Sequence, residues 1–131
     1  MGLFSFLKSN KRFVSEKQLQ ENIRHQQAMN EETLFEFNEY GIDENATRIL
    51  EFFFFSNDVL KLEQLKAALL NMKCKELQLE QDPESKKHWV LFGETNPMKM
   101  ELSTINNWTK NLCEIGFEYD CDFDGWGAKM E

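Results

Sequence analysis

The stretch Arg48-Ile-Leu-Glu-Phe-Phe-Phe-Phe55 decides the fold, because its four consecutive Phe residues form the longest apolar block of the chain. A short apolar run predicts a buried strand when turn-forming residues follow it, and Ser56-Asn57-Asp58 follows here. Successive side chains of a strand point to opposite faces of its sheet. Two of the four Phe side chains are therefore expected on each face of the sheet.

The sequence that follows this strand predicts a helix and two further strands. Asn57 or Asp58 caps the helix, which carries its apolar residues on one stripe. Residues 74–81 alternate between polar and apolar types, and residues 86–93 form a second run of strand-forming residues after a turn. The first strand, this helix and the strand over residues 74–81 thus make one strand–helix–strand unit.

A second unit of the same kind completes the chain. Asn96-Pro97 supplies a cap and a first-turn proline for an amphipathic helix, and Gly116 fits the left-handed position just past its end. Residues 117–123 then alternate as a last strand. We therefore expect an α+β fold, a ferredoxin-like βαββαβ sandwich with a four-stranded antiparallel sheet of order 4-1-3-2, both helices on one face and the other face open.

The sequence before the sheet predicts an N-terminal helical extension. Residues 1–14 are expected to form a loose arm, Ser15-Glu-Lys-Gln18 has the form of a capping box that begins one helix, and Asn30 caps a second helix. We accordingly divide the chain into an N-terminal arm with helices, residues 1–46, and a ferredoxin-like domain, residues 47–131.

Charge is distributed unevenly along the 131 residues. The chain has 15 Lys and Arg residues against 23 Asp and Glu residues, a net charge of -8, and such a surface repels a phosphate backbone. Residues 1–25 hold five basic and two acidic residues, so the remainder, with 10 basic and 21 acidic residues, carries -11. The acidic body is expected to bind a basic partner, either another protein or its own N-terminus, and not nucleic acid directly.

The open face of the sheet is expected to combine acidic and aromatic side chains. Glu118, Asp120 and Asp122 alternate on the solvent side of the predicted last strand, and Glu76, Gln78 and Glu80 do the same on the strand at the other edge of the sheet. Phe53 or Phe55 supplies an aromatic centre. Such a surface either binds a basic protein or is covered by the N-terminal helices.

The segment Asp124-Gly-Trp-Gly127 extends this candidate surface. A Trp between two Gly residues indicates a sharply turning backbone, and its indole either seals the sheet as a buried plug or stands out as an interface anchor. Asp124 fits a cap for the turn. The full candidate partner-binding set is Glu118, Asp120, Asp122, Asp124, Trp126, Phe53 and Phe55.

A calcium or metal site is the alternative use of the same acidic residues. The segment from Asp120 to Glu131, with Asp122 and Asp124 inside it, satisfies the pattern D-x-[DN]-x-[DN]-G-x5-E of a calcium loop. A calcium loop needs helices on both sides, whereas these aspartates follow a period of two. The alternation favours an amphipathic strand, so we expect no metal ligands here.

Catalysis has little support in the sequence. His25 falls in a polar helical stretch, His88 begins a strand, and Cys113 and Cys121 fall on apolar faces where thiols are inert. The chain has no Gly-rich phosphate loop, Ser nucleophile elbow or H-E-x-x-H motif. We expect a protein that is not an enzyme and needs no cofactor.

The cellular compartment follows from two further features. No apolar run approaches the length of about 18 residues that a membrane span needs, and the first residues make a poor signal peptide. The three Cys residues are an odd number without C-x-x-C spacing, which favours reduced thiols. We expect a cytoplasmic protein without a membrane partner.

The end of the chain resembles a known family. Phe123-Asp-Gly-Trp-Gly127, preceded by Tyr119-Asp-Cys-Asp122, resembles the regulator of ribonuclease activity B family of bacterial proteins. Four further segments support the resemblance, which covers residues 48–128: Glu51-Phe-Phe-Phe-Phe-Ser56, Leu91-Phe-Gly-Glu-Thr-Asn-Pro97, Trp108 and Cys113-Glu-Ile-Gly116.

The resemblance implies a ferredoxin-like fold and a non-catalytic role, the inhibition of ribonuclease E by binding, with an effect on RNA turnover. The expected partner is ribonuclease E or a similar basic RNA-processing enzyme. A toxin-neutralising protein or a homodimer that uses the same surface remains the alternative among interaction proteins.

Overall fold

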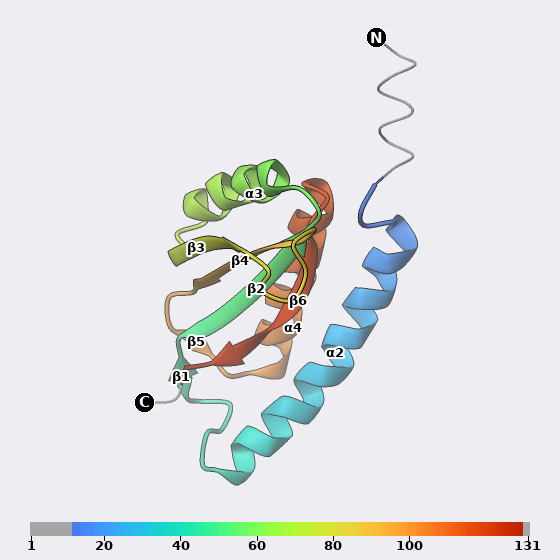
Figure 1. Cartoon of the computed structure of the whole chain (residues 1–131). Coiled ribbons are helices and arrows are strands. Elements are labelled where there is room, and N and C mark those ends of the chain that lie inside the picture. The colour runs from blue at the N-terminus through green and yellow to red at the C-terminus, as the bar shows by residue number, and fades with distance from the viewer. Residues whose placement is uncertain (1–11, 130–131) are drawn as a thin grey trace.

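The computed structural model describes residues 12–129 (Figure 1). Most of the arm expected over residues 1–14 lies outside the described part. The first described helix, α2 (Glu16–Glu39), begins at the predicted capping box: Ser15 Oγ accepts from the Gln18 N–H at 3.1 Å, and Gln18 Oε1 accepts from the Ser15 N–H at 2.7 Å. The capping box is therefore confirmed.

The prediction of a second N-terminal helix capped by Asn30 is wrong, because α2 continues through this position for 24 residues in all. Asn30 is fully buried and its side chain binds residues of α4 (Leu102–Glu118) and β6 (Asp122–Ala128). A polar residue that looks like a cap in the sequence thus makes tertiary hydrogen bonds within a continuous helix.

The main sheet has four antiparallel strands in the order β3-β4-β2-β6, which is the order expected from the sequence. Its members are β2 (Leu50–Ser56), β3 (Lys75–Gln81), β4 (Trp89–Glu94) and β6. The helix α3 (Val59–Asn71) connects β2 to β3, and α4 connects β4 to β6. A second, two-stranded sheet pairs β1 (Thr47–Arg48) with β5 (Met98–Lys99) and was not expected from the sequence.

One face of the main sheet carries the larger hydrophobic core. Phe52 and Phe54 of β2 are fully buried there, and they share one cluster with apolar residues of α3, α4 and the first turns of α2. In Figure 1, α4 lies behind the strands and α2 runs alongside α4 and β6. The other two Phe residues of the run, Phe53 and Phe55, point to the opposite face, so the predicted division of the four side chains is confirmed.

The last predicted strand begins five residues too early. Residues 117 and 118 complete α4, and Asp120, with φ of 60°, turns the chain into β6. Gly116 lies inside the helix and not at a left-handed position past its end. A Cβ atom there would approach the carbonyl oxygen of Cys121 to 2.8 Å and Phe54 Cε1 to 3.0 Å, so glycine is needed for close packing.

The predicted start of the same helix at Asn96-Pro97 is also wrong. These residues precede β5, and α4 starts only at Leu102, with Glu101 in the N-cap position. The backbone N–H of Met100 instead bonds to the carbonyl of Ala46, which places this segment beside β1. Within residues 12–129, no helix is both long enough and apolar enough to span a bilayer.

Candidate protein-interaction surface

The open face of the main sheet has two Phe residues at its centre. Phe53 of β2 lies opposite Phe92 of β4, and their ring centroids are 6.3 Å apart. On the other side Phe53 pairs with Gly125 of β6, which has no side chain to cover the ring. Phe53 is consequently 36% exposed, an unusual state for an aromatic residue on a central strand.

Acidic side chains surround this aromatic pair. The strand registers place Glu51 of β2, Glu80 of β3, Glu94 of β4 and Asp122 of β6 on the same face as Phe53. Glu94 is neutralised by Lys129, whose Nζ lies 3.1 Å from its carboxylate. We call the set Glu51, Phe53, Glu80, Phe92 and Asp122 the open-face surface.

Phe55 is less accessible than Phe53, because a residue from the N-terminal segment lies against it. The ring of Phe13 meets Phe55 edge-on at a centroid distance of 5.6 Å, and the imidazole of His88 lies 6.1 Å from Phe55. The sequence left open whether the N-terminal helices cover the open face. In the structure, α2 packs on α4 and on the β6 edge, and Phe13 contacts the end of the open face near Phe55.

Asp120 occupies the turn between α4 and β6 and not the solvent side of a strand. Its two carboxylate oxygens accept the backbone N–H groups of Phe13 and Val14, each at 2.9 Å, and Lys61 Nζ lies 2.6 Å from Oδ2. Arg12 approaches the same carboxylate at 3.6 Å and stacks on the ring of Phe117. Burial alone would raise the pKa of Asp120, but these hydrogen bonds outweigh it and lower the pKa.

The other predicted acidic residues are dispersed. Glu118 is exposed at the last position of α4, and Asp124 is exposed at the β-bulge where the pairing of β6 with β2 shifts. Asp122 is half-buried, and burial together with the neighbouring Asp124 raises its pKa. Only Asp122 of these three lies in register with the open-face residues of β2.

The aspartates of the candidate calcium loop lie on a strand and its preceding turn and not in a loop between two helices. Asp122 and Asp124 belong to a strand, and the carboxylate of Asp120 already binds Lys61 and two backbone N–H groups. Among the residues that the structure describes, no three His, Cys, Asp or Glu side chains converge as metal ligands; Glu131 lies outside that range.

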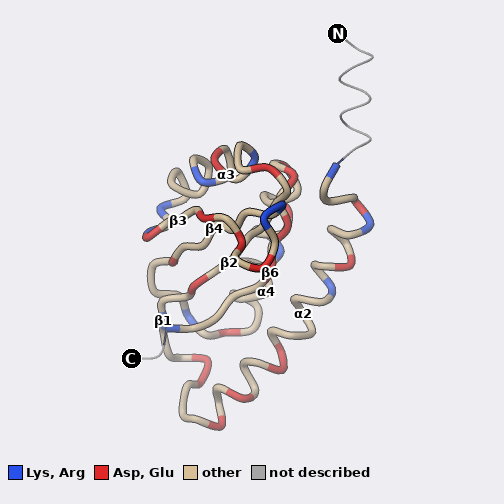
Figure 2. Tube along the Cα trace, viewed as in Figure 1, with Lys and Arg blue, Asp and Glu red and all other residues tan. Residues whose placement is uncertain are grey.

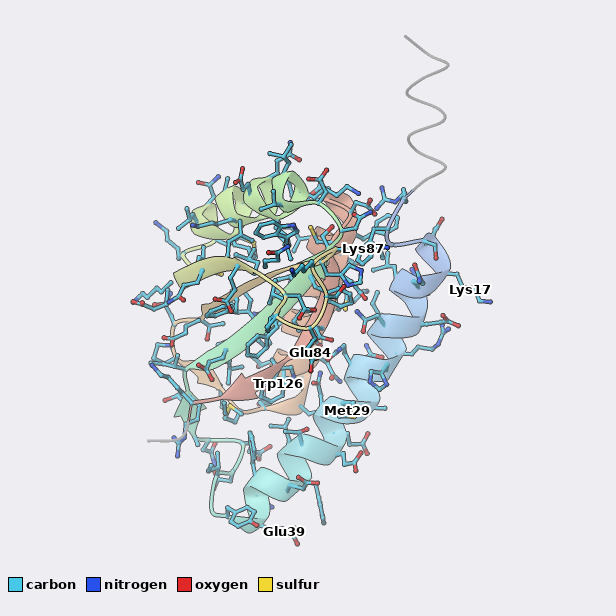
Figure 3. The ribbon with its side chains drawn as sticks, in the orientation of Figure 1. Lys17, Met29, Glu39, Glu84, Lys87 and Trp126 are labelled. Carbon is cyan, nitrogen blue, oxygen red and sulfur yellow. The ribbon has the colours of Figure 1, made fainter. Side chains whose placement is uncertain are left out.

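Trp126 projects to the helical side of β6, away from the open face. Its Nε1–H donates to Asn30 Oδ1 at 2.7 Å, and its ring meets Trp108 of α4 and Phe37 of α2 edge-on at centroid distances of 6.1 Å and 6.3 Å. Figure 3 shows Trp126 on the strand beside the middle of α2. These contacts hold the indole of Trp126 inside the fold. This is the role of a plug that seals the sheet, one of the two roles expected from the sequence.

The candidate nucleophiles are protected from reaction. Cys113 and Cys121 are buried, and burial raises the pKa of both thiols to about 12. Such thiols stay protonated at neutral pH and are poor nucleophiles. His88 packs against the rings of Phe13 and Phe55.

Four residues with a role in the site were missed from the sequence: Glu51, Phe13, Lys61 and Phe92. Phe92 could have been found, because it alternates with Leu91 on a predicted strand and must point to the open face. Phe13 and Lys61 lie more than 50 residues from Asp120 in the chain, and no local pattern links them.

Comparison with known proteins identifies the family of the chain. Residues 27–128 match the family described as Regulator of ribonuclease activity B, a segment that includes the second half of α2 and every strand. A search of curated proteins returned no significant match. Because the matched segment covers well over half of the chain, the protein belongs to the regulator of ribonuclease activity B family.

Proposed function

We propose that this protein is a non-catalytic regulator that binds a ribonuclease, ribonuclease E or a similar basic RNA-processing enzyme, and lowers its activity by contact. The family match over residues 27–128 carries the proposal. The setting we propose is the cytoplasm of a bacterium.

We further propose that the ribonuclease binds the open-face surface. Phe53 supplies an exposed ring for burial at the centre of an interface, and Glu51, Glu80 and Asp122 supply charge for a basic partner. Of the residues expected to bind the partner, Phe53 and Asp122 are the ones that this surface contains. Asp120 and Trp126 support it from within the fold.

The arrangement of the elements supports two finer proposals. The antiparallel order β3-β4-β2-β6, with α3 and α4 on one side, fits a ferredoxin-like sandwich. We also keep the division of the chain at residues 46 and 47, which separates the α2 segment from the strands in topology although α2 shares their core.

The test is an inhibition assay with purified ribonuclease E and a fluorescently labelled RNA oligonucleotide. The initial cleavage rate is expected to fall as the full-length protein is added. Phe53→Ser removes the central ring, so about tenfold more protein is expected for half-inhibition, the loss of one moderate hot spot.

The matched control is Leu60→Ser, which removes an apolar side chain of α3 that is 62% exposed. This variant is expected to inhibit like the unmodified protein. If the unmodified protein leaves the cleavage rate unchanged and does not bind the enzyme, the proposed function is wrong. If both variants inhibit equally well, the function stands and the open-face surface is not the contact.

A further inference from the structure

The C-terminal half of α2 and the loop after it form a strongly acidic part of the surface. Residues 25–47 contain six Asp and Glu residues and no Lys or Arg. Figure 2 shows acidic segments and no basic ones along this part of the trace. In Figure 3, Glu39 marks this end of α2 and Lys17 marks the other end.

These acidic residues form no ion pairs within residues 12–129. The acidic residues of this stretch are Glu31, Glu32, Glu36, Glu39, Asp43 and Glu44. Between residues 12 and 129, none of the six forms an ion pair within 4.0 Å. Lys99, which pairs with Thr47 where β5 meets β1, forms its ion pair with Glu101 instead, at 3.8 Å.

A groove of about 400 Å³ lies between this end of α2, the loop and the start of α4. Its apolar lining consists of the buried residues Ile42 and Met100 and the more exposed residues Leu34, Phe35 and Leu102. We call it the α2–α4 groove. Its volume falls within the range of about 300–1,000 Å³ that is usual for ligand sites.

Two apolar side chains that line this groove are exposed to solvent. Phe35 is 66% exposed and Leu102 is 38% exposed, and both line the groove. The carboxylates of Glu31, Asp43 and Glu44 border the same groove. Exposed apolar residues with a charged border are typical of a protein-binding surface.

We propose that the α2–α4 groove binds a basic, amphipathic segment of a partner protein. The apolar side of such a segment would bury Phe35 and Leu102, and its Lys or Arg side chains would pair with Glu31, Asp43 and Glu44. This is the helix-in-groove mode of recognition, with charge complementarity to set the orientation. Nucleic acid does not fit this groove, because its phosphates would face the unpaired carboxylates.

This site is separate from the open-face surface and does not depend on the ribonuclease proposal. The groove is formed by the far end of α2 and the start of α4, whereas the open-face surface lies on β2, β3, β4 and β6. Its test therefore uses a peptide probe and no ribonuclease.

The probe is a fluorescein-labelled amphipathic peptide of Lys and Leu, about four helical turns long, with Leu at a helical spacing. Fluorescence anisotropy with the full-length protein is expected to show saturable binding. The same peptide with Glu in place of Lys is expected not to bind.

Two variants test the location. Phe35→Ser removes the most exposed apolar side chain of the groove, and the double variant Glu31→Lys and Glu44→Lys reverses two charges at its border; each is expected to weaken binding about tenfold. The matched control reverses Glu63 and Glu84 to Lys, two exposed residues of α3 and the β3–β4 turn. This control has the same net charge as the double variant and is expected to keep the original affinity.

The proposal is overturned if the Lys-containing peptide does not bind, if the Glu-containing peptide binds equally, or if the groove variants bind as tightly as the control. Light scattering tests a second copy of the chain as the occupant. A dimer that Phe35→Ser converts to a monomer would assign the groove to self-association and would also overturn the proposal. Far-UV circular dichroism checks that each variant is folded.

Discussion

At the scale of single residues, Asp120 connects three parts of the molecule: the N-terminal segment, α3 and the turn before β6. Its carboxylate binds the backbone of Phe13 and Val14 from the N-terminal segment and the ammonium group of Lys61 from α3, while Asp120 itself forms the turn before β6. Asp is one of the few residues besides Gly that adopt the left-handed conformation readily. The residue is therefore suited to both the turn and the carboxylate contacts.

The lowered pKa of Asp120 predicts a dependence of stability on pH. A carboxylate whose pKa is lower in the folded state stabilises the fold fully above its ordinary pKa of 3.8, and this contribution is lost as the pH falls through the lowered value. Asp120→Asn tolerates the same backbone and removes the charge. The variant is expected to be about 1–3 kcal/mol less stable near neutral pH, from the loss of charged hydrogen bonds.

Urea unfolding followed by Trp fluorescence, at neutral pH and again below pH 3.8, measures this difference. The gap between the two proteins should shrink at the lower pH, and a constant gap would contradict the assignment. Asp122 has a raised pKa, so its contribution to the stability of the fold increases as the pH falls. Both proteins contain Asp122, so this contribution cancels when their free energies of unfolding are compared.

Asn30 is the second residue whose role comes from its surroundings. Its amide group accepts from Trp126 Nε1 and donates to Asn106 Oδ1 and Thr109 Oγ1 at 2.9 Å and 3.0 Å. Because Asn30 and Thr109 are fully buried, water has little access to replace these bonds.

Asn30→Ala is expected to lower the free energy of unfolding by about 1–3 kcal/mol, since it leaves the Trp126 N–H and the Thr109 hydroxyl without this partner. Urea unfolding measures the change. Asn107→Ala, at an exposed position of α4, is the control and should stay within about 0.5 kcal/mol of the unmodified protein. Equal stability of the two variants would show that the buried amide is dispensable.

At the scale of an element, the length of α4 determines where the last strand begins. The buried positions of α4 include Ile105, Thr109, Leu112 and Gly116, spaced by three or four residues, which is the period of a helix facing a sheet. Gly116 continues this stripe, and its missing side chain allows α4 to lie close to Phe54 and to the backbone of Cys121.

Gly116→Ala is expected to destabilise the protein, although Ala favours a helix over Gly by about 1 kcal/mol. The new methyl group would press on the Cys121 carbonyl, a backbone atom that cannot rotate away, and overpacking of this kind costs about 1–3 kcal/mol. Thermal unfolding measures the result. Gly127→Ala is the control, because no atom lies within 4 Å of the added Cβ; an equal change in both variants would contradict the packing argument.

At the scale of the whole molecule, the net charge of -8 is concentrated on particular surfaces. The open-face surface holds Glu51, Glu80 and Asp122 around an aromatic centre, and the α2–α4 groove has a border of carboxylates at the other end of α2. Both surfaces favour basic partners.

Electrostatic attraction predicts that binding to ribonuclease E is sensitive to salt. The association rate constant, measured by stopped-flow fluorescence, is expected to fall about tenfold between about 0.05 M and 0.5 M salt, because the Debye length becomes shorter. The dissociation rate constant should change less. An association rate that is independent of salt would contradict a role for the acidic surfaces.

Much of the fold followed from local patterns in the sequence. The Phe run, the stripe of α3 and the capping box of α2 each lie within a short segment, and the sheet order follows from two strand–helix–strand units. The errors fell at Asn30, Pro97 and Gly116, where a residue typical of a helix end serves another purpose in the tertiary structure.

The sequence by itself determined the α+β class, the order of the main strands and the resemblance of the chain to its family, because periodicity and short motifs are local properties. Only the tertiary structure decided that Asp120 and Trp126 are bound within the fold, that Phe53 stays exposed and that the acidic end of α2 borders a groove. Each of these depends on residues far apart in the chain, whose proximity is created by packing and is not contained in any single segment.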